Sequence, residues 1–369
     1  MLILFEKKIT MINTTLLNTI CTTPGAPGFE QKVRELVMNE VKDLVDELET
    51  DNMGNVYAIK RGKGSDIIKT TDGQRNKRVM VGAHMDEIGF IVTHIDDNGF
   101  IRFHTLGGFD PKTLTAQRVI VHGTEDIIGV MASKPIHVMS PEERNKVAKT
   151  KDYFIDTGMS AEQVKKRVNI GDPITREREF IEMGDCVNGK SLDNRLAVFI
   201  LIETLRNLKD KEIPFDLYGV FTVQEEVGIR GANVSSLRVN PDFGFGLDTT
   251  IAFDLPGAAA HEQITKLGEG TAIKIMDAST ICDYRMVDFM KKTADKKEIK
   301  WQPEILTAGG TDTAGIQRMT EGGSIAGAVS IPTRHLHQVI EMAHKEDIKG
   351  SIDLLTACIE EIDQHDWSF

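Results

Sequence analysis

Short apolar segments that end in an acidic residue or a histidine recur along the sequence. The stretch from Phe221 to Val223 is typical of a buried strand, and the neighbouring acids Glu225 and Glu226 follow it closely. Open α/β sheets bind ligands beyond the carboxyl ends of their strands, so residues in such positions are expected to share one edge of a sheet. The acidic residues and histidines where predicted strands meet loops are His84, Asp193, Glu225, Glu226, Asp248 and His337.

Helical spacing and buried-strand patterns alternate in the two outer parts of the sequence and predict an α/β domain. The predicted helices are 12–22, 29–45, 195–209, 281–297, 338–344 and 346–363. The predicted strands are two within 47–60 and single strands at 78–83, 215–223, 243–247, 271–276 and 325–331. The polar residues 63–77 are expected to form a loop, and residues 1–10 a variable extension.

The middle of the sequence has a different pattern, with short alternating segments typical of β-strands. Asp97-Asn98-Gly99 is a strong hairpin signal, because Asn-Gly supplies the left-handed conformations of a tight turn. We therefore expect residues 92–182 to form a small β-rich domain. This domain is predicted to interrupt the α/β domain, whose two parts are residues 1–91 and 183–369.

Composition excludes several classes of partner. The 56 acidic residues outnumber the 44 basic ones and give a formal net charge of −12, which argues against nucleic acid or an anionic membrane surface as the main partner. The longest apolar run, 196–202, is far shorter than a membrane span, and the apolar start of the chain is too short for a signal peptide. Four scattered cysteines are typical of reduced thiols, so we expect a cytoplasmic protein.

Each candidate residue alone also has an ordinary structural explanation. His84 could be a plain strand-end histidine, Glu225 and Glu226 could lie on a solvated loop, and Asp193 could simply favour the start of a helix. Alternatively, His84 could bind a metal while Asp86, which projects on the same side of the chain, orients its ring.

Taken together, the candidates favour a metal site. Two histidines, two aspartates and a glutamate suit a pair of divalent metals with one aspartate bridging them, and this mixture of nitrogen and oxygen ligands fits zinc or cobalt better than magnesium or calcium. A further glutamate beside a ligand glutamate would be well placed as a base for a bridging water.

The glycine-rich loop 307–313 lacks the lysine of a Walker motif and the dinucleotide-binding fingerprint, which argues against a phosphate site. Its glycines leave room for the backbone to approach a substrate, so Gly310 and Thr311 are candidate substrate-binding residues. The alternative is a plain turn before a helix.

The order of the motifs points to one family. The segments are AHMDEIGF (83–90), GGFDP (107–111), SLDNR (191–195), VQEEVGIRGA (223–232), the region of Asp248, AGGTD (308–312) and PTRHLH (332–337). In this order they resemble the dinuclear-metal aminopeptidases that assemble as tetrahedral dodecamers, which include glutamyl and deblocking aminopeptidases and relatives once labelled endoglucanases. Each motif is weak alone, but their joint order and spacing are specific, and the resemblance covers nearly everything after residue 12.

The resemblance implies a mixed central sheet flanked by helices, as in zinc peptidases, and a PDZ-like dimerisation domain for the inserted block. It also implies a role for each site residue: His84 and Asp248 hold one metal, Glu226 and His337 hold the other, Asp193 bridges them, Glu225 is the general base, and Asp86 orients His84.

The sequence departs from the family pattern at three positions. His335 stands where the family usually has tyrosine, so two histidines compete for one ligand role. His337 is preferred, because its place relative to Pro332-Thr333-Arg334 matches the family. Asn194 and Thr313 replace an aspartate and an alanine of many members, and neither change is expected to abolish the site.

The activity implied by the resemblance is removal of the amino-terminal residue from short peptides inside a shell of six dimers. One rival is glycoside hydrolysis, which needs two facing carboxylates roughly 5–9.5 Å apart. Adjacent Glu225 and Glu226 fit that poorly, and an aromatic content of 6% offers few sugar platforms. Another rival is a metal-bound assembly protein without turnover. The side-chain preference of the enzyme stays open.

Overall fold

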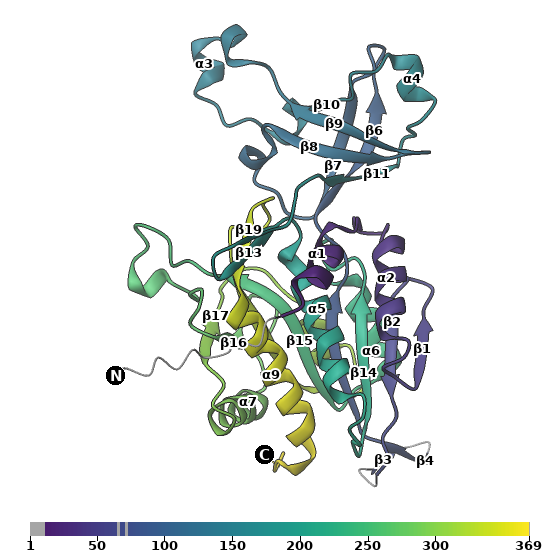
Figure 1. Cartoon of the computed structure of the whole chain (residues 1–369), viewed down its shortest axis with the longest axis vertical. Helices are drawn as coiled ribbons and strands as arrows, with labels where there is room; N and C mark the ends of the chain where they lie inside the picture. Colours follow the sequence, from purple (N-terminus) through teal and green to yellow (C-terminus); the bar gives the residue numbers. More distant parts are fainter. Residues whose placement is uncertain (1–11, 65–66, 71–72, 369) are drawn as a thin grey trace, which may run out of the picture.

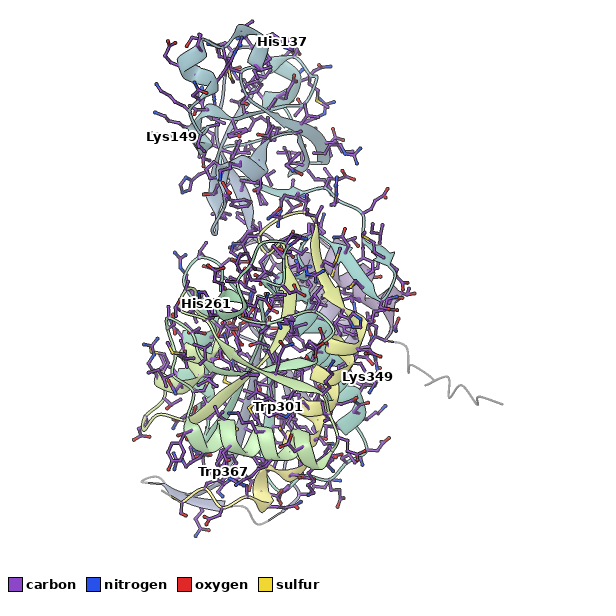
Figure 2. All side chains as sticks on the ribbon, turned by 90° about the vertical axis from the view of Figure 1, so that its left-hand side faces the viewer. His137, Lys149, His261, Trp301, Lys349 and Trp367 are labelled. Atoms are coloured by element: carbon purple, nitrogen blue, oxygen red, sulfur yellow. The ribbon has the colours of Figure 1, made fainter. Side chains whose placement is uncertain are left out.

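The computed structural model describes residues 12–64, 67–70 and 73–368, and the extension expected at residues 1–10 lies outside this part. An α/β body carries a smaller β-barrel at one end (Figure 1). His137 and Lys149 lie on the part of the barrel remote from the body, whereas Trp367 lies near the opposite end of the molecule (Figure 2). None of the helices in the described residues is long and apolar enough to cross a membrane.

A mixed sheet of 11 strands forms the centre of the described body, in the order β1-β2-β14-β5-β15-β18-β19-β13-β12, with β16 paired to β18 and β17 paired to β16. Its strands are β1 (Glu47–Thr50), β2 (Val56–Lys60), β5 (Arg78–His84), β12 (Ile181–Met183), β13 (Cys186–Gly189), β14 (Asp216–Thr222), β15 (Phe243–Ile251), β16 (Thr271–Met276), β17 (Trp301–Ile305), β18 (Ile325–Arg334) and β19 (Glu341–His344). The four strands β14, β5, β15 and β18 are parallel neighbours, so their carboxyl ends meet at one edge.

Helices cover both faces of the sheet. They are α1 (Thr14–Thr22), α2 (Gln31–Val41), α5 (Leu192–Leu208), α6 (Arg230–Val239), α7 (Tyr284–Lys296), α8 (Thr313–Arg318) and α9 (Lys345–Glu361). In β5, Val79 and Val81 belong to the large core that includes α5, whereas Met80 packs in a smaller core with residues of α6 and α8. Side chains alternate across a strand, so these two cores lie on opposite faces. Burial on both faces explains the nearly continuous apolar runs of the parallel strands.

The barrel is closed by the strands β10-β7-β6-β11-β8-β9 and has a hydrophobic core of its own. Its elements are β6 (Gly89–Ile95), β7 (Ile101–Leu106), β8 (Gln117–His122), β9 (Asp126–Ala132), α3 (Pro141–Arg144), β10 (Phe154–Asp156), α4 (Ala161–Lys165) and β11 (Pro173–Arg176). The Asp97-Asn98-Gly99 turn joins β6 to β7, which confirms the predicted hairpin. The barrel strands run from Gly89 to Arg176, and β12 pairs within the main sheet.

The helix predicted at 338–344 is wrong, because these residues turn and then form β19, which pairs with β13 and β18. A short apolar run fits either element, and here pairing with β18 and with the distant strand β13 decides. The loop predicted at 63–77 contains a hairpin of β3 (Ile67–Thr70) and β4 (Gly73–Asn76). Strand β15 continues past Asp248 to Ile251 because it stays paired with β18, so Asp248 lies within the strand instead of at its end.

Candidate metal centre

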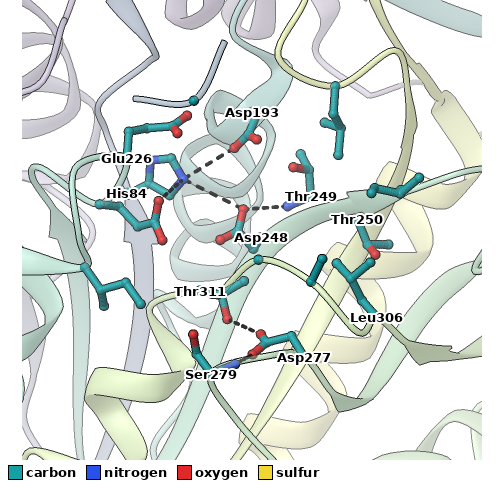
Figure 3. A pocket seen from close by; sticks show the side chains of 18 of the residues that line it. His84, Asp193, Glu226, Asp248, Thr249, Thr250, Asp277, Ser279, Leu306 and Thr311 are labelled. Atoms are coloured by element: carbon teal, nitrogen blue, oxygen red, sulfur yellow. Dashed lines mark hydrogen bonds and ion pairs between the residues drawn. The ribbon is translucent and has the colours of Figure 1, made fainter. Parts of the chain in front are cut away.

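The first group of possible metal ligands joins three elements at the carboxyl edge of the parallel strands (Figure 3). His84 ends β5, Asp248 lies in β15, and Asp193 precedes the regular part of α5, because the backbone of Asp193 and Asn194 is not helical. His84 Nε2 lies 3.4 Å from Asp193 Oδ1 and 3.8 Å from Asp248 Oδ1. These side chains could each offer one ligand atom to the same ion.

A second group adjoins the first and shares one residue with it. It consists of Asp193, Glu226 and His337. His337 Nε2 lies 3.3 Å from Asp193 Oδ2 and 3.6 Å from Glu226 Oε2. Asp193 therefore turns one oxygen toward each histidine, which is the arrangement needed to bridge two ions.

Glu225 and Asp86 lie beside these groups. Glu225 Oε2 is 3.7 Å from His84 Nε2. The Asp86 carboxylate accepts hydrogen bonds of 3.0 Å from the backbone N–H groups of both Glu225 and Glu226. His84 Nδ1 lies 3.1 Å from the backbone carbonyl oxygen of Asp86 and 3.5 Å from Asp86 Oδ1. Asp86 thus contacts the histidine ring and also accepts hydrogen bonds from the turn with the two glutamates, a contact that sequence reasoning did not find.

Of the two competing histidines, His337 faces the carboxylates, and His335 belongs to neither group of described ligands. The ring of His337 is oriented by a contact of 2.8 Å between Nδ1 and the carbonyl oxygen of Gly108. A hydrogen bond at one ring nitrogen leaves the other free as a ligand. Glu341 in β19 accepts from the backbone N–H of His337 at 2.9 Å and of Asp193 at 3.0 Å, and so connects both groups.

The cluster contains a surplus of buried acidic groups, and this surplus shifts the pKa values of its side chains. Burial and the charge of Asp193 raise the pKa of Glu226 to about 8. Burial also raises the pKa of Glu225 and of Asp248. Burial alone would lower the pKa of His337, but Asp193 and Glu226 outweigh it and raise that pKa to about 10. The cluster therefore retains protons that a divalent cation could replace.

The donor set suits such a cation. Glu226 Oε1 is buried and has no hydrogen-bond partner among the described residues. An unpartnered buried carboxylate oxygen is costly unless a cation or a proton compensates it. Carboxylates together with imidazoles are ligands for zinc-type metals, so the residues fit the metal that the sequence predicts.

The cluster opens into a cavity of about 550 Å³. The loop with Gly310 and Thr311 lines it, but the Thr311 hydroxyl donates to Asp277 Oδ2 at 3.2 Å. A Cβ at Gly310 would lie 2.1 Å from Ser279 Oγ, so packing also demands a glycine there. Lys274 forms part of the wall, and sequence reasoning did not single it out.

Several known proteins are similar to this chain in sequence and in fold. The sequence profile of the M42 glutamyl aminopeptidase family matches residues 64–354. A putative aminopeptidase of Acetivibrio thermocellus is 37% identical over 345 residues, covering 93% of this chain and 97% of that protein. The lysyl aminopeptidase of Pyrococcus furiosus is 30% identical over 365 residues, covering 97% of this chain and 100% of the relative.

Among solved structures, the TET1 peptidase of Pyrococcus horikoshii matches with a TM-score of 0.82 at 30% identity, covering 94% of this chain and 98% of that one. It can assemble into a tetrahedron or a large octahedral shell, and another of its structures is a dodecamer. Agreement over nearly the whole length, in sequence and in fold, places the chain in the M42 family of metallopeptidases as an aminopeptidase.

Proposed function

We propose that the chain removes the amino-terminal residue of short peptides at a centre that binds two divalent ions, zinc or cobalt. The position of Asp193 carries this proposal, because its two oxygens lie 3.4 Å from His84 Nε2 and 3.3 Å from His337 Nε2. The two groups suggest the role of each residue: His84 and Asp248 would hold one ion, Glu226 and His337 would hold the other, and Asp193 would be shared by both.

Other residues of the site have roles in proton transfer, positioning and substrate binding. Bound metals would act as Lewis acids and lower the pKa of a water nucleophile to about 7. Glu225 lies outside both ligand groups, so its carboxylate is free to take the proton of the attacking water and return it to the leaving amine. A positioned general base typically contributes ~10²–10⁴-fold in rate. Asp86 holds Glu225 and Glu226 in place and orients His84, while the surplus of carboxylates is complementary to the free α-ammonium group of a peptide.

The cavity disfavours an acidic amino-terminal side chain. Among the described residues that line the cavity there is one lysine, Lys274. Its side chain is fully buried, and its Nζ lies 2.9 Å from Asp277 Oδ2 and 3.4 Å from Glu304 Oε1. An acidic substrate side chain would have to compete with these carboxylates for the same cation. Ile251 and Leu306 offer apolar surface, and the backbone at Gly310 and Thr311 allows close approach.

The proposed assembly rests on the relatives. We divide the chain into a catalytic domain of residues 1–91 and 183–369 and a PDZ-like dimerisation domain of residues 92–182, through which dimers form and then combine into a dodecamer. Such a shell would admit short peptides and exclude folded proteins. The four cysteines are free thiols, which supports the proposal of a cytoplasmic enzyme.

One assay tests this function against its rivals. The protein is incubated with leucyl-, glutamyl- and lysyl-nitroanilide and with cellulose, each with and without a chelator. We expect chelator-sensitive release of nitroaniline, with kcat/KM at least ~10-fold higher for the leucyl than for the glutamyl substrate, because a glutamyl side chain meets buried carboxylates of its own sign. Release of sugar from cellulose would support the glycoside hydrolase, and inertness toward every substrate would support an assembly protein.

A further inference from the structure

Two segments of the barrel reach out of it and hold His337, a residue of the α/β body. The carbonyl oxygen of Gly108, in the loop after β7, lies 2.8 Å from His337 Nδ1. Arg176, the last residue of β11, donates from Nη1 to the carbonyl oxygen of His337 at 3.2 Å. The backbone of His337 is left-handed, with φ of 60°, a conformation that a residue with a side chain keeps only when its surroundings enforce it.

Arg176 is fixed in the barrel. It is only 3% exposed, and its guanidinium carbon lies 5.6 Å from the centre of the Phe109 ring. Phe109 stacks on Phe90, a residue of the barrel core, with ring centres 4.6 Å apart and planes at 27°. A continuous series of packed planar groups therefore runs from the barrel core to the backbone of His337, and it leaves Arg176 little freedom to move independently.

The same loop of the barrel also approaches Glu226. A Cβ at Gly107, whose φ is 100°, would lie 3.4 Å from Glu226 Cβ, and a Cβ at Gly108 would lie 3.4 Å from His337 Nδ1. Within the described chain, the hydrogen bonds and ion pairs of His84 and Asp248 go to residues of the α/β body. The barrel therefore contacts Glu226 and His337, whereas the polar contacts of His84 and Asp248 come from the α/β body.

From this asymmetry we propose that the barrel completes the metal position of Glu226 and His337, with Arg176 as its positioning residue, while the position of His84 and Asp248 forms without the barrel. The inference rests on the proposed two-metal site. Coupling is reciprocal, so an ion in the position of Glu226 and His337 also holds the barrel in place against the body.

The test measures cobalt binding by calorimetry and metal content after gel filtration, on the full chain. In Arg176→Met, which keeps a long side chain but loses the donor to the His337 backbone, one of two binding events should weaken by up to ~10–100-fold, the range typical for loss of residues that orient a metal ligand. The matched control is Arg118→Ala, which removes a surface arginine of the same barrel, paired with Glu177, and should leave both events unchanged.

Background variants identify which position is affected. In an Asp248→Ala background, where the position of Glu226 and His337 remains, Arg176→Met should weaken the surviving event by the same factor. In a His337→Ala background it should change nothing further. A purely structural role of Arg176 would instead lower the affinity in both backgrounds.

Gly108→Ala acts on the same histidine through a different contact and decides the question if Arg176→Met fails to fold. It should weaken the same event several-fold. The inference is overturned if the wild type binds two ions and these variants bind both with unchanged affinity, or if both events weaken equally. A wild type that binds no ions contradicts the proposed function itself, and with it this inference.

Discussion

His335 and His337 are separated by one residue, yet only His337 joins a ligand group of the described chain. His337→Ala should therefore lose one of two metals and nearly all peptidase activity. His335→Ala is its matched control and should keep both metals, with any change confined to KM. Metal analysis and steady-state kinetics on the two variants check this, and loss of a metal from His335→Ala alone would reverse the assignment.

Glu226 and His337 also make metal binding depend on pH. Their pKa values of about 8 and about 10 mean that both hold a proton at pH 7 when no metal is bound. A metal needs the carboxylate and the neutral imidazole, so binding must release these protons. The affinity for cobalt should therefore fall as the pH is lowered from 8 to 6, by about tenfold per unit for each proton displaced. Calorimetry in two buffers of different ionisation enthalpy counts the protons, and a net release of zero would contradict the pKa shifts.

At the scale of elements, a buried ion cluster fastens the loop after β5 to the start of α5. Glu87 accepts from Lys190 Nζ at 2.8 and 2.6 Å and lies 3.7 Å from Arg195 Nη2, all three being buried. Burial alone would raise the pKa of Glu87, but Lys190 and Arg195 hold it below its ordinary value. Its stabilising effect is therefore complete above its unfolded pKa near 4.5 and is lost as the pH falls through the lower folded value.

Glu87→Gln should consequently lower the free energy of unfolding by about 3–5 kcal/mol near pH 7, because it leaves Lys190 buried without its charged partner. The control is Glu212→Gln, which breaks an exposed pair with Lys63 and should cost at most about 1 kcal/mol. Urea unfolding of metal-free protein measures both. Equal midpoints for the two variants would show that the buried cluster adds nothing to stability.

The elements also explain what the sequence could predict. The parallel strands were predictable because burial on both faces leaves continuous apolar runs. Their carboxyl ends share one edge of the sheet, so it was also predictable that His84, Glu226 and Asp248 lie near one another. Strand β19 was not predictable, because one of its two partners, β13, comes from a distant part of the chain. Glu341 was missed for the same reason, since its partners at Asp193 and His337 meet it only in the folded sheet.

At the scale of the whole molecule, the barrel lies at one end of the molecule, away from most of the body (Figure 1). We predict that metal-replete protein forms at least dimers and is mainly a dodecamer in solution, the assembly that one structure of the TET1 relative contains. Light scattering coupled to gel filtration gives the mass directly. A metal-replete monomer would contradict both the dimer interface and the exclusion of folded proteins, and a stable dimer would contradict the shell alone.

The central claim is that Asp193 joins two metal positions while Glu225 performs proton transfer. The most direct measurement is the metal content of Asp193→Ala and Glu225→Gln, taken beside their peptidase activity. Asp193→Ala should lose both ions and all activity, whereas Glu225→Gln should keep two ions per chain and lose ~10²–10⁴-fold in kcat. Two ions retained in Asp193→Ala, or full turnover in Glu225→Gln, would contradict the account.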